Sequence, residues 1–190
     1  MFKRSQSFAI LLLSTLAMLG MQAPSGAWLK FEAPDKSFSL QVPTKLEPMP
    51  RKTKDTTVSK KKDEKGVEQD VKGQIITDLW LGRLNDGLYL AGVTDYPVQV
   101  GLERELDLDR DNFLKAVDAT LVSESKITQN GYAGREFTAT NKQYADTFKS
   151  RIFTDGWRSY QIVAREPSSS FDGKRVDAFL QSFQIAAKPK

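Results

Sequence analysis

Residues 127–165 constrain the fold more than any other part of this 190-residue chain. Their pattern predicts three strands, and Asp155-Gly156 stands between the second strand and the third. An Asp-Gly pair between two alternating runs is the strongest short-range signal for a β-hairpin, because glycine and aspartate tolerate the positive φ angles of a tight turn. We therefore expect an antiparallel hairpin at the centre of the fold.

Apolar side chains fall on both faces of these predicted strands. In the third strand, Tyr160 and Ile162 share one face and Val163 lies on the other, because successive side chains alternate. In a sheet with one face in water, apolar and polar residues would alternate strictly along each strand. The pattern therefore predicts a sheet that is covered at least partly on both sides. Gly131 and Gly134 in the first strand favour a turn, and the close approach of a ligand is the alternative.

Two further pairs of strands are expected before this segment. A short strand at residues 28–32 precedes an alternating strand at residues 37–42, which Pro43 ends because proline cannot continue a ladder. A long hairpin follows, with strands over residues 74–84 and 88–96 joined by an Asn-Asp-Gly turn.

Two segments have the apolar spacing of amphipathic helices, residues 106–122 and residues 173–183. Asp172 or Ser170 is expected to cap the second helix, since a short polar side chain accepts hydrogen bonds from its first free N–H groups. The spacing of the second helix predicts four core side chains, Val176, Phe179, Leu180 and Phe183.

Four aspartates near the first predicted helix have the spacing of a calcium-binding loop. Asp107, Asp109, Asp111 and Asp118 match its ligand positions 1, 3, 5 and 12. However, Asn112 stands where such a loop needs glycine, and Asp118 is shorter than the usual bidentate glutamate. We therefore predict no metal-binding residues here and expect Asp109 or Asp111 to cap the helix, with a calcium site as the alternative.

The N-terminus has the features of a secretory signal peptide. Lys3 and Arg4 precede a mostly apolar run at residues 8–19, and small residues up to Ala27 suit cleavage after that residue. The run is too short to span a bilayer, although an uncleaved anchor is the alternative. We expect residues 1–27 to be a signal peptide and residues 28–190 to be a single domain. The domain is expected in the periplasm or another extracytoplasmic compartment, with no stable membrane anchor after cleavage.

The residue types that are missing exclude much chemistry. The chain contains no histidine and no cysteine. This excludes a Ser-His-Asp triad, a thiol nucleophile, the usual Cys/His zinc sites and haem held by histidine or cysteine. We expect no catalytic and no cofactor-binding residues. An enzyme that uses carboxylates or a hard metal is the alternative, and Asp78, Asp95 and Asp155 are its scattered candidates.

Residues 51–65 hold seven basic residues, three acidic residues and one apolar residue, Val58. Such a segment cannot bury enough apolar surface to order itself, so we predict a mobile basic loop. Its charges are expected to face solvent. The functional alternative is contact with an anionic surface or an acidic partner through Lys60, Lys61 and Lys62.

The net charge gives no reason to expect a nucleic-acid partner. The predicted signal peptide carries Lys3, Arg4 and no acid, so its removal lowers the formal net charge from +4 to +2.

The order of these motifs resembles the Mog1/PsbP-like superfamily, especially its small exported bacterial members. The motifs are F-S-L-Q-V-P from Phe38, G-Y-A-G-R-E-F from Gly131 and F-L-Q-S-F from Phe179. The resemblance implies an α+β fold, an α/β/α sandwich with a central antiparallel sheet of about six strands flanked by helices. Characterised members are mostly accessory proteins, including a photosystem extrinsic subunit and a GTPase-binding factor. The resemblance therefore implies an exported, non-catalytic accessory or binding protein whose partner and oligomeric state the sequence leaves open.

Overall fold

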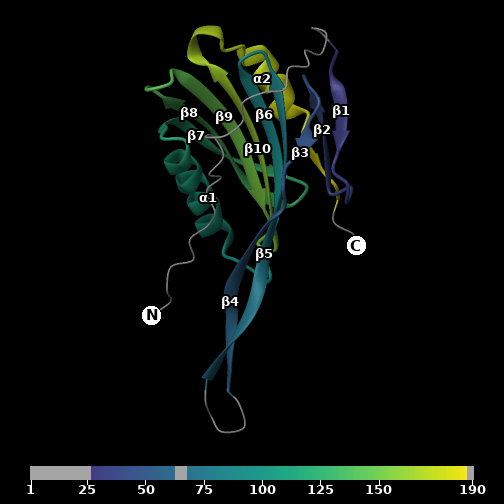
Figure 1. Ribbon diagram of the computed structural model, residues 1–190, viewed down its shortest axis with the longest axis vertical. Helices are drawn as coiled ribbons and strands as arrows, with labels where there is room; N and C mark the ends of the chain where they lie inside the picture. The colour runs from purple at the N-terminus through teal and green to yellow at the C-terminus, as the bar shows by residue number, and fades with distance from the viewer. Residues whose placement is uncertain (1–26, 63–67, 188–190) are drawn as a thin grey trace.

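The computed structural model describes residues 27–62 and 68–187, and within them two antiparallel sheets make up most of the molecule (Figure 1). The large sheet has eight strands in the order β3-β5-β6-β10-β9-β8-β7, with β4 paired to β5. The small sheet has the order β1-β2-β11. The strands are β1 (Leu29–Glu32), β2 (Phe38–Val42), β3 (Glu47–Pro48), β4 (Lys52–Lys62), β5 (Glu68–Leu84), β6 (Gly87–Asp95), β7 (Thr120–Gln129), β8 (Tyr132–Asn141), β9 (Asp146–Thr154), β10 (Arg158–Pro167) and β11 (Gln184–Ile185). The helices are α1 (Leu102–Ala116), the 3₁₀ turn η1 (Ser168–Ser170) and α2 (Gly173–Gln181).

The predicted hairpin at Asp155-Gly156 is confirmed and joins β9 to β10. The Asp155 amide donates to the Arg158 carbonyl at 3.2 Å, and the Asp155 carboxylate accepts from the amides of Trp157 and Arg158 at 2.9 Å. Gly156 has a φ of 89°, a conformation that a residue with a side chain rarely adopts. The turn fixes the register, with Ser159 opposite Thr154.

The predicted sandwich of helices around a sheet is wrong, because the protein is mostly β. Strands cover part of the surface that the sequence analysis assigned to helices, since the small sheet packs beside the short α2. The first predicted helix also ends early. Asp118 has a φ of 49°, which stops α1, and the β-branched residues that follow enter strand β7.

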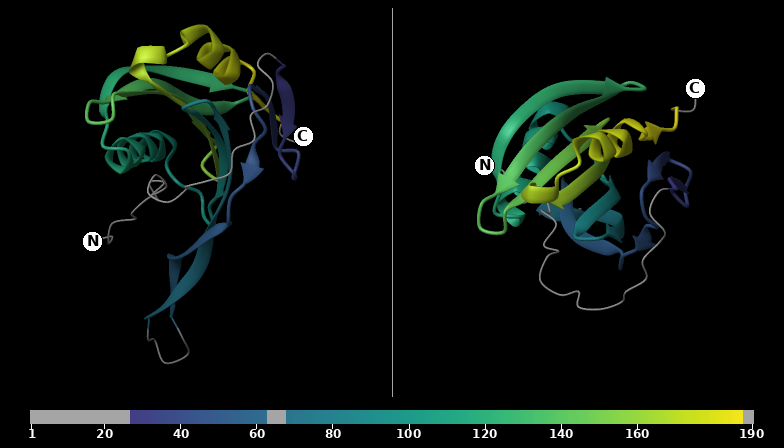
Figure 2. Two further views of the ribbon diagram at one scale, coloured as in Figure 1. Left: turned by 45° about the horizontal axis from the view of Figure 1, so that its top comes forward. Right: turned by 90° about the horizontal axis from the view of Figure 1, so that it is seen from above.

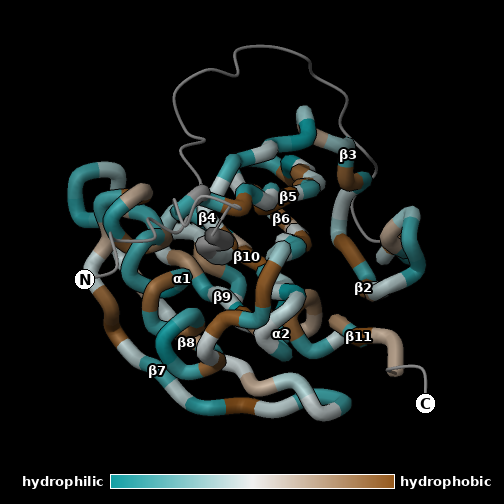
Figure 3. The backbone as a smooth tube through the Cα atoms, turned by 90° about the horizontal axis from the view of Figure 1, so that it is seen from below, coloured by the Kyte–Doolittle hydropathy of each residue, from teal (hydrophilic) through white to brown (hydrophobic). Residues whose placement is uncertain are grey.

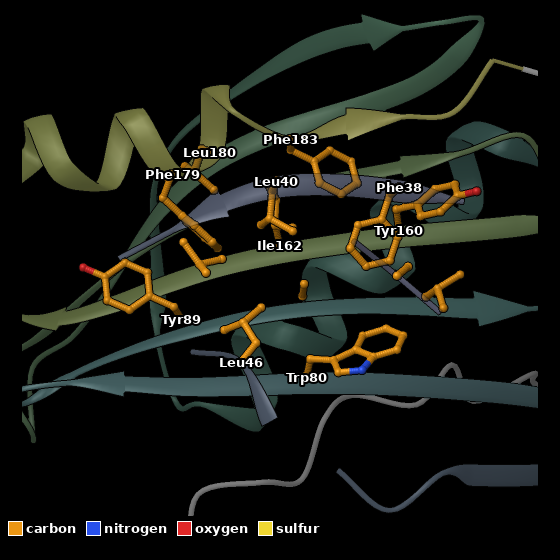
Figure 4. Packing of buried hydrophobic residues seen from close by; sticks show 14 of the residues in the cluster. Phe38, Leu40, Leu46, Trp80, Tyr89, Tyr160, Ile162, Phe179, Leu180 and Phe183 are labelled. Atoms are coloured by element: carbon orange, nitrogen blue, oxygen red, sulfur yellow. The ribbon is translucent and has the colours of Figure 1, made fainter. Parts of the chain in front are cut away.

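Each face of the large sheet has its own hydrophobic core. On one face, α2 and the small sheet pack against β5, β6 and β10, and Phe38 lies within 6 Å of Trp80, Tyr160 and Phe183, ring centre to ring centre (Figure 4). The four side chains predicted for the core in and after α2 are all buried, so that prediction is confirmed.

The opposite face curves around α1 (Figure 2). Phe113 of α1 packs there against Phe137 and Phe148 of the sheet. Seen from below, the central strands β6 and β10 lie between α1 and the small sheet (Figure 3). The sheet is therefore covered on both sides along its middle, as the two-faced apolar pattern predicted.

A two-stranded ribbon extends from one end of the molecule (Figure 1). We call it the arm and define it as residues 52–62 of β4 with residues 68–75 of β5. The predicted loop is therefore wrong over residues 52–62, and residues 63–65 lie outside the described part of the chain. Ladder hydrogen bonds to β5 order this segment without deep burial, and Thr53, Thr56 and Thr57 favour the extended backbone.

The arm joins the body through a close contact at Gly73. A Cβ atom built there would lie 2.6 Å from Pro97 Cβ and 2.7 Å from Val58 Cγ1. Val58, the one apolar residue of the basic segment, therefore packs at this junction. Glycine lets the ribbon lie directly against the loop that follows β6.

Among the described helices, none has the length and apolar character needed to cross a membrane. Residues 1–26, which contain most of the predicted signal peptide, lie outside the described part of the chain.

Candidate functional site

A pocket of about 380 Å³ opens where the arm joins the body, and we call it the root pocket. Four strands of the large sheet, β3, β5, β6 and β10, contribute to it, together with the turn after β1 and the segment between β3 and β4. Its apolar lining includes Leu79, Trp80 and Val93. Its charged lining residues are Asp35, Arg51, Asp78, Asp95 and Arg158.

The strand register brings the charged residues together. Asp78 of β5 lies opposite Val93 of β6, so Asp95, two residues further along β6, is a diagonal neighbour of Asp78 on the same face. Arg158 of β10 lies directly opposite Asp95. Carboxylates on two adjacent strands therefore share one pocket.

Two arginines each donate a pair of hydrogen bonds to one of these carboxylates. Arg51 donates from Nε and Nη2 to the two oxygens of Asp78, at 2.7 and 2.9 Å. Arg158 donates from Nε and Nη2 to the two oxygens of Asp95, at 2.5 and 3.0 Å, and from Nη1 to Asp35 at 2.8 Å. Such two-pronged pairs fix orientation as well as charge.

The surroundings of Asp35 and Arg158 favour the charged form of each. Burial raises the pKa of Asp35, but hydrogen bonds from Ser37 and the charge of Arg158 outweigh burial and hold that pKa below its usual value. The hydrogen bond to Asp95 raises the pKa of Arg158 above its usual value, against the opposing effect of burial. A general acid needs a carboxyl pKa that is raised toward the working pH. Asp35 does not meet this requirement, because its pKa is lowered.

The structure brings together two of the three scattered carboxylates. Asp78 and Asp95 line the root pocket, whereas Asp155 binds backbone amides in the β9–β10 turn. Sequence reasoning missed Asp35, Arg51 and Arg158. Arg51 was counted only as one charge of a basic run. Arg158 reaches the pocket because the strand register places it opposite Asp95, and the sequence alone does not reveal that register.

The four aspartates with calcium-loop spacing do not form a loop. Asp107, Asp109 and Asp111 lie inside α1, and Asp118 follows it. No group of three or more potential metal-binding side chains is found in the described residues. The predicted cap at Asp109 or Asp111 is also wrong, because α1 begins at Leu102 and its N-cap is Gly101. In α2 the predicted cap is confirmed, since the Asp172 carboxylate accepts from the Arg175 amide at 3.1 Å.

The aspartates of α1 instead belong to two different environments. Asp109 is packed between α1 and the sheet, near Glu105, whose carboxylate accepts a 2.9 Å hydrogen bond from the Tyr96 hydroxyl. Burial raises the pKa of Asp109 to about 8, and the charge of Glu105 adds to the effect. This acid lies under α1 and does not line the root pocket.

Between α1 and the strands β7 and β8, an ion-pair network ties the helix to the sheet. Arg135 of β8, which is buried, lies 2.5 Å from Glu103, 3.5 Å from Asp107 and 3.4 Å from Glu124. Arg110 donates to Glu124 at 2.8 Å, and Lys126 lies 3.2 Å from Glu103. We call these residues the α1–β7 network.

The predicted partner-binding residues, Lys60, Lys61 and Lys62, lie in the outer part of β4. The backbone register places Lys60 across from Asp70 and Lys62 across from Glu68. Their side chains lie outside what the structure describes.

Comparison with protein-family models and with curated proteins gives no match for this chain. Membership of the Mog1/PsbP-like superfamily therefore stays a prediction.

Proposed function

We propose that this protein is an exported, non-catalytic binding protein that holds a segment of a partner protein at the root pocket. The observation that carries the proposal is the pair of Arg–Asp forks around an apolar pocket at the root of the arm. Hydrogen bonds already hold the side chains of this site in place, so binding a partner costs little further ordering of them.

The lining suggests the kind of segment that fits. The root pocket holds three carboxylates and two guanidinium groups beside Trp80 and Val93. A basic side chain next to an apolar one would complement this surplus of negative charge and this apolar surface. The alternative is a carboxylate enzyme, and Asp35 does not favour it as a general acid, because the pKa of Asp35 moves away from the range that acid catalysis needs.

The basic part of β4 extends this proposal. Lys60, Lys61 and Lys62 would contact an acidic surface of the same partner, because β4 runs from the pocket into the arm. Replacing all three with glutamine should leave the unfolding midpoint unchanged and weaken binding in a way that added salt mimics.

Site-specific photo-crosslinking in the exported fraction tests the pocket. A photoreactive residue in place of Met49, which lines the pocket but belongs to neither Arg–Asp pair, should give one discrete adduct, and the same residue in place of Tyr144, at the other end of the strands, should give none. Excess unlabelled protein should compete for the adduct. An unlabelled variant with Asp78→Asn and Asp95→Asn, shown by circular dichroism to be folded, should not.

Equal competition by the wild type and the double variant would show that these carboxylates do not recognise the partner. Matching adducts from both labelled positions would show that the pocket is not the binding surface.

A further inference from the structure

Strand β7 forms the free edge of the large sheet, at the opposite side from the arm (Figure 1). Within the described residues it pairs with β8 alone, and its first seven residues are all exposed. Leu121 is 37% exposed and Val122 is 61% exposed. The outer N–H and C=O groups of such an edge are a template for another strand.

The edge lacks most of the usual protection against pairing. It contains no proline, and its one lysine, Lys126, lies 3.2 Å from Glu103 on the α1 side. A bulge between Leu121 and Ser123 interrupts the register at one end only, and the ladder from Ser123 to Gln129 is regular.

The charges of β7 are self-complementary about one residue. If two copies of β7 pair antiparallel with Ser125 opposite Ser125, each Glu124 faces the Lys126 of the other copy. A register centred on Glu124 or on Lys126 would place like charges opposite each other, which is destabilising. Registers centred between two residues bring neither charge opposite the other. The charges therefore select one pairing among its neighbours.

We propose that two copies of this chain associate through β7, antiparallel and centred on Ser125, to form one continuous sheet across a twofold axis. A twofold interface uses the same patch on both copies, which is what a self-complementary strand provides. Lys126 of one copy would approach Glu124 of the other, so the two α1–β7 networks would join across the axis.

Because Ser125 lies on the axis, it allows a direct test with the full-length chain. Wild-type protein should sediment as a dimer. Ser125→Lys and Ser125→Glu should each be monomeric, because each places like charges opposite each other. An equimolar mixture of the two variants should form a one-to-one heterodimer, since lysine then faces glutamate.

Ser59 provides the matched control, because it is an exposed serine on β4, at the other edge of the same sheet. Ser59→Lys and Ser59→Glu should remain dimeric. Ser125→Cys adds a second measurement, since the chain has no other cysteine and directly opposed residues lie within disulfide distance. It should oxidise to a covalent dimer, and Ser59→Cys should not.

A wild type that sediments as a monomer at every concentration measured would overturn the proposal. So would a mixture of the two Ser125 variants that stays monomeric, once circular dichroism has shown that both are folded.

Discussion

At the residue scale, burial raises the pKa of both Asp35 and Asp109, but their neighbours give the two carboxylates opposite net shifts. Asp35 meets hydrogen bonds from Ser37 and the charge of Arg158, and its pKa falls. Asp109 is enclosed under α1 beside Glu105, and its pKa rises. The difference decides which acid is ionised at neutral pH, and it makes Asp109 a source of pH-dependent stability.

We expect the folded protein to lose stability as pH rises from about 4 to about 8. The folded state keeps the Asp109 proton up to a pKa of about 8, while the unfolded chain releases it near pH 4. The contribution is complete below pH 4 and declines by at most about 1.4 kcal/mol per pH unit through that window. Asp109→Asn should flatten this decline and be more stable than the wild type at pH 8.

Urea unfolding from pH 5 to pH 8 measures this effect. Asp111→Asn, an exposed position on the same helix, should keep the wild-type slope. An Asp109→Asn curve parallel to the wild type would show that Asp109 does not hold the proton.

At the element scale, the arm can pack against the body only because residue 73 is glycine and has no side chain. Gly73→Ala would place a Cβ within 2.6 Å of Pro97 and 2.7 Å of Val58. The arm or the loop after β6 must then move, and we expect a loss of about 1–3 kcal/mol in the free energy of unfolding. Hydrogen exchange should rise in residues 52–59 and 70–75.

Gly101→Ser is the control, because a Cβ at Gly101 meets nothing within 4 Å and serine is a favoured N-cap residue. It should not destabilise the protein. If Gly73→Ala also leaves both the stability and the exchange of the arm unchanged, then the junction is not tightly packed.

Elements with a strong local signal were predictable from the sequence. The turn at Asp155-Gly156, the four apolar residues near α2 and the cap at Asp172 all follow from short-range chemistry. The strand β4 was not predictable in this way, because ladder hydrogen bonds to β5 order it while its side chains stay largely polar. The start of β7 was hidden because Leu121 continues the helical spacing of α1.

At the scale of the whole molecule, the candidate site was only partly predictable. Asp78 and Asp95 were recognised as carboxylates near strand ends, and their meeting depends on the β5–β6 register. Arg158 reaches them through the pairing of β6 with β10, which is remote in sequence. A pocket built from long-range pairings has no local sequence signature.

We expect the exported form to begin at Trp28. Cleavage after Ala27 would leave β1, which starts at Leu29, intact at the edge of the small sheet. N-terminal sequencing of the exported fraction checks this expectation. A start at Met1 in soluble exported protein would show that the segment is not removed, and a start beyond Leu29 would show that cleavage removes part of β1.

The pairing of β6 with β10 also has a kinetic consequence. Strands β4–β6 form one local meander and strands β7–β10 form another. Within the large sheet, the pairing of β6 with β10 joins the two meanders, with Asp95 opposite Arg158 and Leu88 opposite Arg165, and we call this pairing the seam. Each meander can form as soon as its own hairpins close, but the seam must close a long loop first, so it should form late. Until β10 arrives, the growing chain carries β6 as an open edge, and that interval is when a newly made molecule is most exposed to pairing with the wrong strand.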